Sequence, residues 1–477
     1  MDHSTEKTTA PRRRITFAES AGIMLLYIVM FLYGSGILGN TKVTMAMSMF
    51  ICTVITAIYA MLALRITWKE LNDSVLATLA KAMPSIFLLM MVGFLAASWL
   101  ACGTTPALIY YGMLVIKPQI FLLAAFLICA LCSNLSGSSW STVATFGLAF
   151  FGIAQGLGMP VLVTVGAIIC GAFIGDKWSP MSDSTNLCAA LTETDVFELF
   201  GHLMPTNGIA TAVTAVIFLG LGISYAGQAK DMSAVMVVAG QITDAFHINV
   251  LLLIPIILIV VLSIKRKPTL PVLILSVLTS VLLGMLFQGR SYAQMMGYLW
   301  KGFVSNTGNA EFDSLVSGGG LLNVGECVFI MFIALAMAGV LEQTKATTVI
   351  AEKLAALTKN RGMLVITALF VGIFGTFLGA TSYTGMIMVT SMFAPMYEKA
   401  GFSKIDLART AVSAGLVSFL VPWGSSHNLI AANLGVTAGE FGPYCFILWI
   451  VLGLNILYGF TGWFSGPKKA KADRAAQ

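Results

Sequence analysis

Charged side chains are scarce in this sequence. Only 10% of its 477 residues are Asp, Glu, Lys or Arg, whereas a soluble domain carries roughly 25%. Hydrophobic residues make up 58%, and the mean hydropathy is +0.89. So little charge cannot cover that much apolar surface in water, which excludes soluble, disordered and coiled-coil chains. Since about 20 apolar residues make one crossing, we expect an all-α polytopic membrane protein.

The residue patterns of enzymes and cofactor sites are also missing. The eight cysteines lie mostly in apolar runs, without the spacing of a metal site or a disulfide framework. The glycine run Gly318-Gly319-Gly320 has no phosphate-loop context, and we expect it to be the flexible end of an exterior loop. We therefore expect no enzyme, no cofactor and no nucleic-acid partner, and we interpret the net charge of +6 as an orientation signal.

Basic residues gather where apolar runs end. Arg12-Arg13-Arg14 precede the first run, Lys265-Arg266-Lys267 follow a later one, and Lys468-Lys469 follow the last. By the positive-inside rule these clusters stay in the cytoplasm. The pattern predicts ten crossings with both termini cytoplasmic. We expect a multi-pass protein of the bacterial cytoplasmic (inner) membrane, with lipid around it and a homodimer as its assembly.

Polar residues interrupt four apolar stretches, two in each half of the chain. We interpret 118–157 and 362–395 as re-entrant hairpins, and 160–191 and 405–435 as broken helices. Five crossings in each half turn the second half upside down, which is the inverted-repeat plan of secondary transporters. The predicted parts are a first repeat 1–225, a linker 226–246, a second repeat 247–464 and a tail 465–477.

The spacing within the interrupted regions repeats. Trp140 precedes Asn186 by 46 residues, and Tyr383 precedes Asn428 by 45. Broken helices are tolerated in a membrane only where they line a cavity or bind something, because unpaired backbone groups cannot face lipid. Matching breaks in two halves therefore predict a midplane binding site and alternating access, which we expect to be of the elevator type.

The first break carries the charges that predict a cation site. Oxygen ligands suit Na⁺, and a desolvated carboxylate also takes up a proton more readily. We expect Na⁺ and H⁺ to be the coupling ions. We expect both to compete for Asp183, the proposed Na⁺ ligand. The alternative for Asp176 and Lys177 is a local ion pair at a helix end. The predicted cation-binding and proton-coupling residues are Asp183, Asp176, Ser182, Thr185 and Asn186.

Hydroxyl, amide and imidazole groups mark a second predicted set. Helix N-termini at the hairpin tips and the second break suit an anionic group. His427 could relay protons or bind a substrate carboxylate. The predicted substrate-binding residues are Ser138, Ser139, Asn134, Thr381, Ser382, Ser425, His427 and Asn428.

The string from Gly175 to Leu187, GDKWSPMSDSTNL, resembles the signature of the NhaC family of sodium/proton antiporters. Gly137-Ser138-Ser139-Trp140-Ser141-Thr142 and Pro422-Trp423 resemble other parts of that family. The resemblance implies an ion-transporter-superfamily fold and Na⁺/H⁺ antiport. Two departures, Ala380-Thr381-Ser382 in place of an acidic tip and Gly424 to Asn428 after Pro-Trp, favour an alternative. It is a Na⁺- or H⁺-coupled transporter or exchanger of a small carboxylate (the family includes malate/lactate exchangers) or an amino acid.

Overall fold

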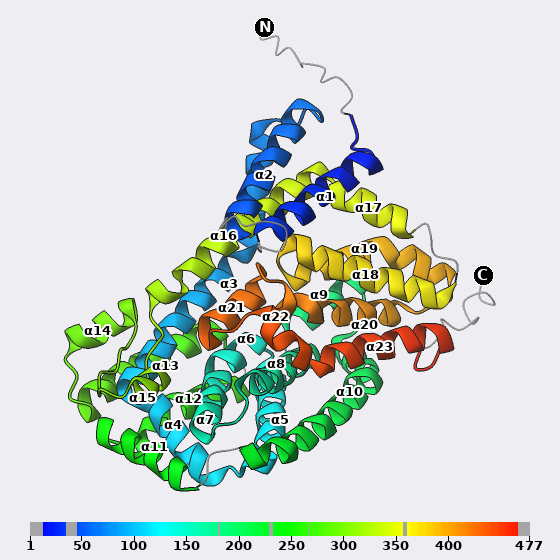
Figure 1. Ribbon diagram of the computed structural model, residues 1–477. Helices are drawn as coiled ribbons and strands as arrows, with labels where there is room; N and C mark the ends of the chain where they lie inside the picture. Colours follow the sequence, from blue (N-terminus) through cyan, green and yellow to red (C-terminus); the bar gives the residue numbers. More distant parts are fainter. Residues whose placement is uncertain are drawn as a thin grey trace. The chain divides into compact units, whose positions relative to one another are not determined.

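Helices account for the regular structure throughout the described residues (Figure 1). The computed structural model describes residues 13–34, 45–179, 182–228, 232–265, 267–355 and 360–465. Within them, seven helices are long and apolar enough to span a membrane, or up to ten if three bent pairs each count as one span. This confirms the predicted all-α polytopic membrane protein. The inverted orientation and the ten crossings remain predictions.

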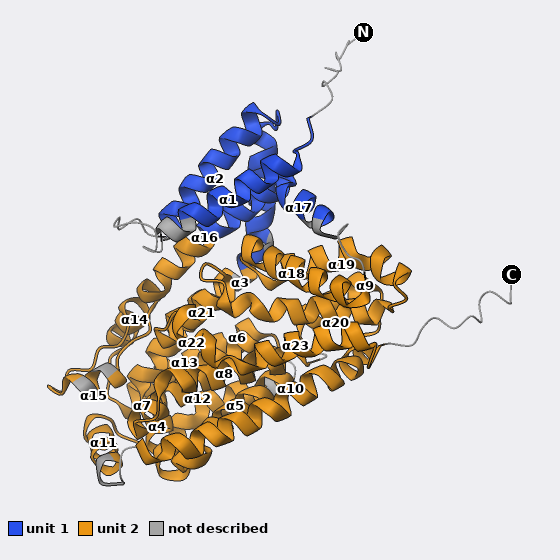
Figure 2. Cartoon of the chain, turned by 45° about the vertical axis from the view of Figure 1, so that its right-hand side comes forward, with its two compact units in different colours: residues 1–83, 332–357 blue, residues 84–331, 358–477 orange. Residues whose placement is uncertain are grey.

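The chain forms two compact units (Figure 2). Unit 1 comprises residues 1–83 and 332–357, where α1 packs against α2 and α17. Unit 2 comprises residues 84–331 and 358–477, and it contains every residue of the two predicted sites. The helices of unit 1 are α1 (Phe17–Gly34), α2 (Met45–Leu62), α17 (Ala346–Ala355) and parts of α3 (Trp68–Cys102) and α16 (Leu321–Thr344).

The first interrupted regions lie early in unit 2. The chain reverses after α5 at Gly137, whose φ of 68° lies in the left-handed region that glycine adopts without strain. It then forms a short α6, a π-helical turn η1 and α7. The helices of this half are α4 (Thr104–Val115), α5 (Pro118–Ser136), α6 (Ser139–Thr142), η1 (Val143–Gly147), α7 (Leu148–Leu157), α8 (Val161–Lys177), α9 (Asp183–Thr192) and α10 (Val196–Tyr225).

The second half of unit 2 repeats this local plan. The chain reverses after α18 at Ala380, again with a left-handed φ of 56°. The final helices are α18 (Arg361–Gly379), α19 (Ser382–Lys399), α20 (Lys404–Gly415), η4 (Leu416–Leu420), α21 (Ser425–Leu434), α22 (Ala438–Phe441), η5 (Gly442–Tyr444) and α23 (Phe446–Thr461). The two helices of the second predicted hairpin, α18 and α19, pack along each other. In the first predicted hairpin, α5 packs along α8 instead, and α7 packs against α4.

The chain between α10 and α16 contains more helix than expected. Residues 226–246, predicted as a linker, include α11. The predicted exterior loop carries two short helices. These elements are η2 (Ala226–Gln228), α11 (Met232–Ala245), η3 (Val250–Leu253), α12 (Ile254–Ile264), α13 (Thr269–Phe287), α14 (Tyr292–Lys301) and α15 (Ala310–Leu315). Of the predicted tail, only Ser465 is among the described residues.

The glycine run at the end of that loop is closely packed. Phe303 and Gly318 form an isolated antiparallel bridge, and the Gly320 amide donates to the Gly93 carbonyl at 2.8 Å. A Cβ on Gly319 would lie 2.2 Å from the Ala97 nitrogen. The run therefore fixes the loop against α3, in place of the flexible end that composition suggested.

Two glycines bring the first hairpin against the first break. A Cβ on Gly171 would lie 2.2 Å from the Phe126 carbonyl oxygen, and one on Gly175 would lie 2.2 Å from that of Ala130. Small residues four apart let helix backbones approach closely. The end of α5 consequently lies beside the end of α8, which positions the candidate site.

Candidate cation site at the first broken helix

The break between α8 and α9 is tied to the hairpin tip beside it. The Ser179 hydroxyl donates to the Asn134 carbonyl at 2.7 Å, and the Asn134 amide donates to the Trp178 carbonyl. Asn134 therefore supports the backbone of the break, although the sequence predicted it as a substrate ligand. Pro180 and Met181 in this break lie outside the described residues.

A polar network closes around the end of α8. Asp176 is buried, and its Oδ2 accepts a hydrogen bond from Ser139 Oγ at 3.0 Å. Lys177 Nζ lies 3.5 Å from the same oxygen and donates to Ser184 Oγ at 2.7 Å. The Ser182 and Ser184 hydroxyls are 2.9 Å apart. The local ion pair, one of the two interpretations of Asp176 and Lys177, is thus present. Ser139 at the hairpin tip also bonds to its carboxylate.

Asp183 lies outside this network, as the first residue of α9. Its side chain is exposed, as is that of Asn186 three residues later, whereas Ser184 and Thr185 are buried. Successive residues on a helix point about 100° apart, so the five consecutive oxygen-bearing side chains cannot all face one ion. Helix α9 instead divides them between two faces.

Two side chains of α9 donate to the backbone of the break. Thr185 Oγ1 donates to the Lys177 carbonyl at 3.2 Å, and Asn186 Nδ2 donates to the Ser182 carbonyl at 2.8 Å. Both side chains were predicted as cation ligands. In this conformation each side chain supports the backbone of the break.

Helix α9 lies near the second hairpin. Helix α9 packs against α19 and α20 (Figure 1), and the Tyr383 phenol at the start of α19 is close enough to Asp183 and Asp176 to interact electrostatically. Thr381 and Ser382, at the same tip, are partly buried. Tyr383 was noted in the sequence only as the counterpart of Trp140, and no local signal indicated its proximity to the carboxylates.

Hydrogen bonds also link the second break to the second hairpin, through different groups. The Ser425 amide donates to the Ala380 carbonyl at 2.9 Å, and Trp423 Nε1 donates to the Phe377 carbonyl at 2.7 Å. Asn428 Nδ2 donates to the Trp423 carbonyl at 3.3 Å. This asparagine therefore closes its break much as Asn186 closes the first one.

His427 is the one predicted substrate ligand with a free buried polar atom. Its side chain is 5% exposed and stacks on Phe441 with ring centroids 6.1 Å apart. Within the described residues, its Nδ1 has no hydrogen-bond partner. Buried polar atoms are seldom left unpaired. Together with the buried Ser425 and Ser426, His427 makes the first turn of α21 polar.

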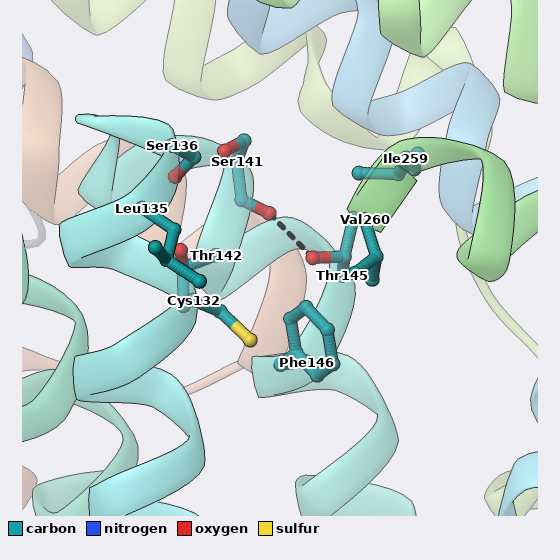
Figure 3. A pocket seen from close by; sticks show the side chains of 9 residues that line it. All are labelled: Cys132, Leu135, Ser136, Ser141, Thr142, Thr145, Phe146, Ile259 and Val260. Atoms are coloured by element: carbon teal, nitrogen blue, oxygen red, sulfur yellow. Dashed lines mark hydrogen bonds between the residues drawn. The ribbon is translucent and has the colours of Figure 1, made fainter. Parts of the chain in front are cut away.

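A small cavity lies beside the first hairpin tip (Figure 3). It encloses about 20 Å³ between α5, η1 and α12, with Cys132, Thr145 and Val260 in its wall. The Thr145 hydroxyl donates to the Ser141 carbonyl at 2.7 Å, as the dashed line shows. Ser138 caps α6 by accepting from the Ser141 amide. One water molecule fills such a volume, so this cavity cannot hold an organic acid.

Comparison with known proteins identifies the family. A family model described as the Na⁺/H⁺ antiporter family matches residues 171–463. The Na⁺/H⁺ antiporter NhaC of Alkalihalophilus pseudofirmus is 31% identical, over 95% of this chain and 96% of its own. The malate-2H⁺/Na⁺-lactate antiporter of Bacillus subtilis is 30% identical, over 86% and 88%. The arginine/ornithine antiporter ArcD of Halobacterium salinarum is 31% identical, over 83% and 82%. The chain therefore belongs to the Na⁺/H⁺ antiporter family that includes NhaC, as its motifs predicted.

Proposed function

We propose that this chain is a secondary active transporter that exchanges Na⁺ for H⁺ across the bacterial cytoplasmic membrane, with both termini in the cytoplasm. The observation that carries the proposal is Asp183, an exposed carboxylate at the N-terminus of a helix inside a break. Asp176 nearby is already paired with Lys177 and Ser139. Asp183 is consequently the carboxylate available to a transported ion.

Charge explains why such a site exchanges ions. A bare carboxylate is expensive to move through the low-dielectric centre of a membrane. Either Na⁺ or a proton neutralises Asp183, and the two compete for the same oxygens. The site therefore moves between the two sides of the membrane when it holds Na⁺ or a proton. It does not move when it is empty and charged. Membership of the family supports this reading, and the paired hairpins support an elevator-type movement.

Asp183→Asn tests the proposal. The amide keeps the size of the side chain but removes its charge and its exchangeable proton. In proteoliposomes we expect Na⁺-driven proton movement to disappear, and in the purified protein we expect Na⁺ binding to weaken at least ~10-fold and lose its pH dependence. Asp244→Asn, on the exposed face of α11, is the control and should leave both unchanged. Unaltered Na⁺ binding in Asp183→Asn would place the coupling site elsewhere.

A second candidate function is the Na⁺- or H⁺-coupled transport of a small carboxylate or amino acid. The first turn of α21 and the buried His427 favour it, since they offer hydrogen-bond donors and a helix N-terminus to an anionic group. The names of the malate/lactate and arginine/ornithine relatives support this class of substrate.

His427→Ala separates the two candidates. If the α21 turn binds a substrate carboxylate, the variant should raise the KM for that substrate while leaving the Na⁺ requirement unchanged. Uptake of labelled organic acids and amino acids, with and without a Na⁺ gradient, provides the measurement. His247→Ala, an exposed histidine, is the matched control. Loss of Na⁺ affinity with unchanged substrate affinity would contradict the assignment of His427.

A further inference from the structure

Lys177 is a buried ammonium at the centre of the first break. Its side chain has a relative exposure of 4%. A lysine rarely lies this deep without a partner, because burial removes the hydration of its charge. Its position therefore requires a compensating group, and the structure supplies two contacts.

Both contacts hold the ammonium in one place. Lys177 Nζ lies 3.5 Å from Asp176 Oδ2 and donates to Ser184 Oγ at 2.7 Å. The backbone of the same residue is fixed as well, since Thr185 Oγ1 donates to its carbonyl. Ser139 donates to the same Asp176 oxygen from the hairpin tip. The lysine head group thus occupies the position that a transported cation would take beside Asp176.

The charges of the break can then be counted. Its described residues, 176–179 and 182–186, carry two aspartates and one lysine. Lys177 compensates Asp176, and Asp183, which is close enough to both to interact with them electrostatically, remains. The net charge of the break is therefore one negative charge, which one monovalent cation or one proton neutralises.

Resting on the proposed function, we infer that Lys177 acts as a tethered resident cation that sets the charge, and hence the ion selectivity, of the transport site. With Lys177 in place, one Na⁺ or one H⁺ neutralises the charge of the break. Without it, two neighbouring carboxylates would together match a divalent cation such as Ca²⁺, which oxygen ligands favour. Lys177 is therefore a specificity-determining residue for monovalent ions.

Charge complementation tests this inference. Radioactive Na⁺ binding to the purified full-length protein is measured with increasing Ca²⁺ as competitor. Lys177→Met should let Ca²⁺ displace Na⁺ at concentrations at least ten-fold lower than in the wild type. Asp176→Asn, which leaves the lysine uncompensated and the break neutral, should weaken Na⁺ binding at least ten-fold. The double variant Asp176→Asn/Lys177→Met restores one negative charge and should restore the selectivity of the wild type.

The outcomes separate a charge effect from a structural one. Lys177→Arg keeps the charge and should keep the selectivity for Na⁺. Wild-type selectivity in Lys177→Met, or a double variant that remains as defective as Asp176→Asn, would overturn the inference. If Lys177→Met does not fold, Asp176→Asn and the double variant still decide the question. Failure of the wild type to exchange Na⁺ for H⁺ in proteoliposomes would refute the proposed function, whereas these binding measurements stand apart from transport.

Discussion

The hydroxyl of Thr185 links the two sides of the first break through the backbone. Thr185 is fully buried, and its Oγ1 donates to the carbonyl of Lys177 across the break. A carbonyl at the end of a helix has no partner within that helix. The Thr185 side chain supplies one for the end of α8.

Replacing Thr185 by valine should therefore lower stability. Valine has the same shape but cannot donate, which leaves the Lys177 carbonyl buried and unpaired at a cost of about 1–3 kcal/mol. Thermal unfolding of the purified protein in detergent is the measurement. Thr185→Ser keeps the hydroxyl and serves as the control. Equal stability of the valine and serine variants would show that this hydrogen bond contributes nothing.

Helices α5 and α8 pack together because their backbones approach closely at two glycines. Gly171 and Gly175 leave no room for a methyl group opposite α5, and the polar ties of Asn134 and Ser179 lie just beyond them. Close packing of one helix pair thus brings a hairpin tip to a break. The geometry of the candidate site follows from this pair.

Gly175→Ala should weaken that packing. The added Cβ would lie 2.2 Å from the Ala130 carbonyl oxygen, and relief of such overlap typically costs about 1–3 kcal/mol. Gly220→Ala on α10 is the matched control, because nothing lies within 4 Å of its Cβ position. In a helix interior that change should stabilise by about 0.5–1 kcal/mol. Thermal unfolding compares the two, and a Gly175→Ala protein as stable as Gly220→Ala would contradict the close contact.

Breaks and hairpins were predictable at the scale of elements, but the faces of α9 were not. The polar strings around Asp183 and His427 mark interruptions in apolar runs, and the structure places helix ends there. Which side chains of α9 are buried depends on how the helix packs against α19 and α20, which the sequence does not specify. The proximity of Tyr383 to Asp183 joins positions far apart in the chain, so a local pattern cannot predict it.

At the scale of the whole molecule, each half of unit 2 packs a short helix against the other half. Helix α9 packs on α19 and α20, while α21 packs on η1 and α7. At the α20 end, His202 Nε2 lies 3.0 Å from Asp406 Oδ1, which also pairs with Arg409. The short helix after each break therefore contacts the hairpin of the other half.

Membrane topology provides the test of the predicted inverted halves. A cysteine replacing Lys267 should react with an impermeant thiol reagent only from the cytoplasmic side, and one replacing Gln228 only from outside. Labelling of intact cells and inverted vesicles is the measurement. The unsubstituted chain gives the background, because Cys132 and Cys327 are partly exposed. Labelling of both positions from one side would rule out the ten-crossing topology.

The contact of α9 with α20 also has a consequence for biosynthesis. Helix α9 ends at Thr192, and α20 begins at Lys404, roughly 200 residues later. At a synthesis rate of about 5–20 residues per second, α9 waits roughly 10–40 s for its partner. During that interval α9 lacks the helices against which it later packs. We therefore expect the newly made first half to expose α9 to quality-control proteases until the second half is made.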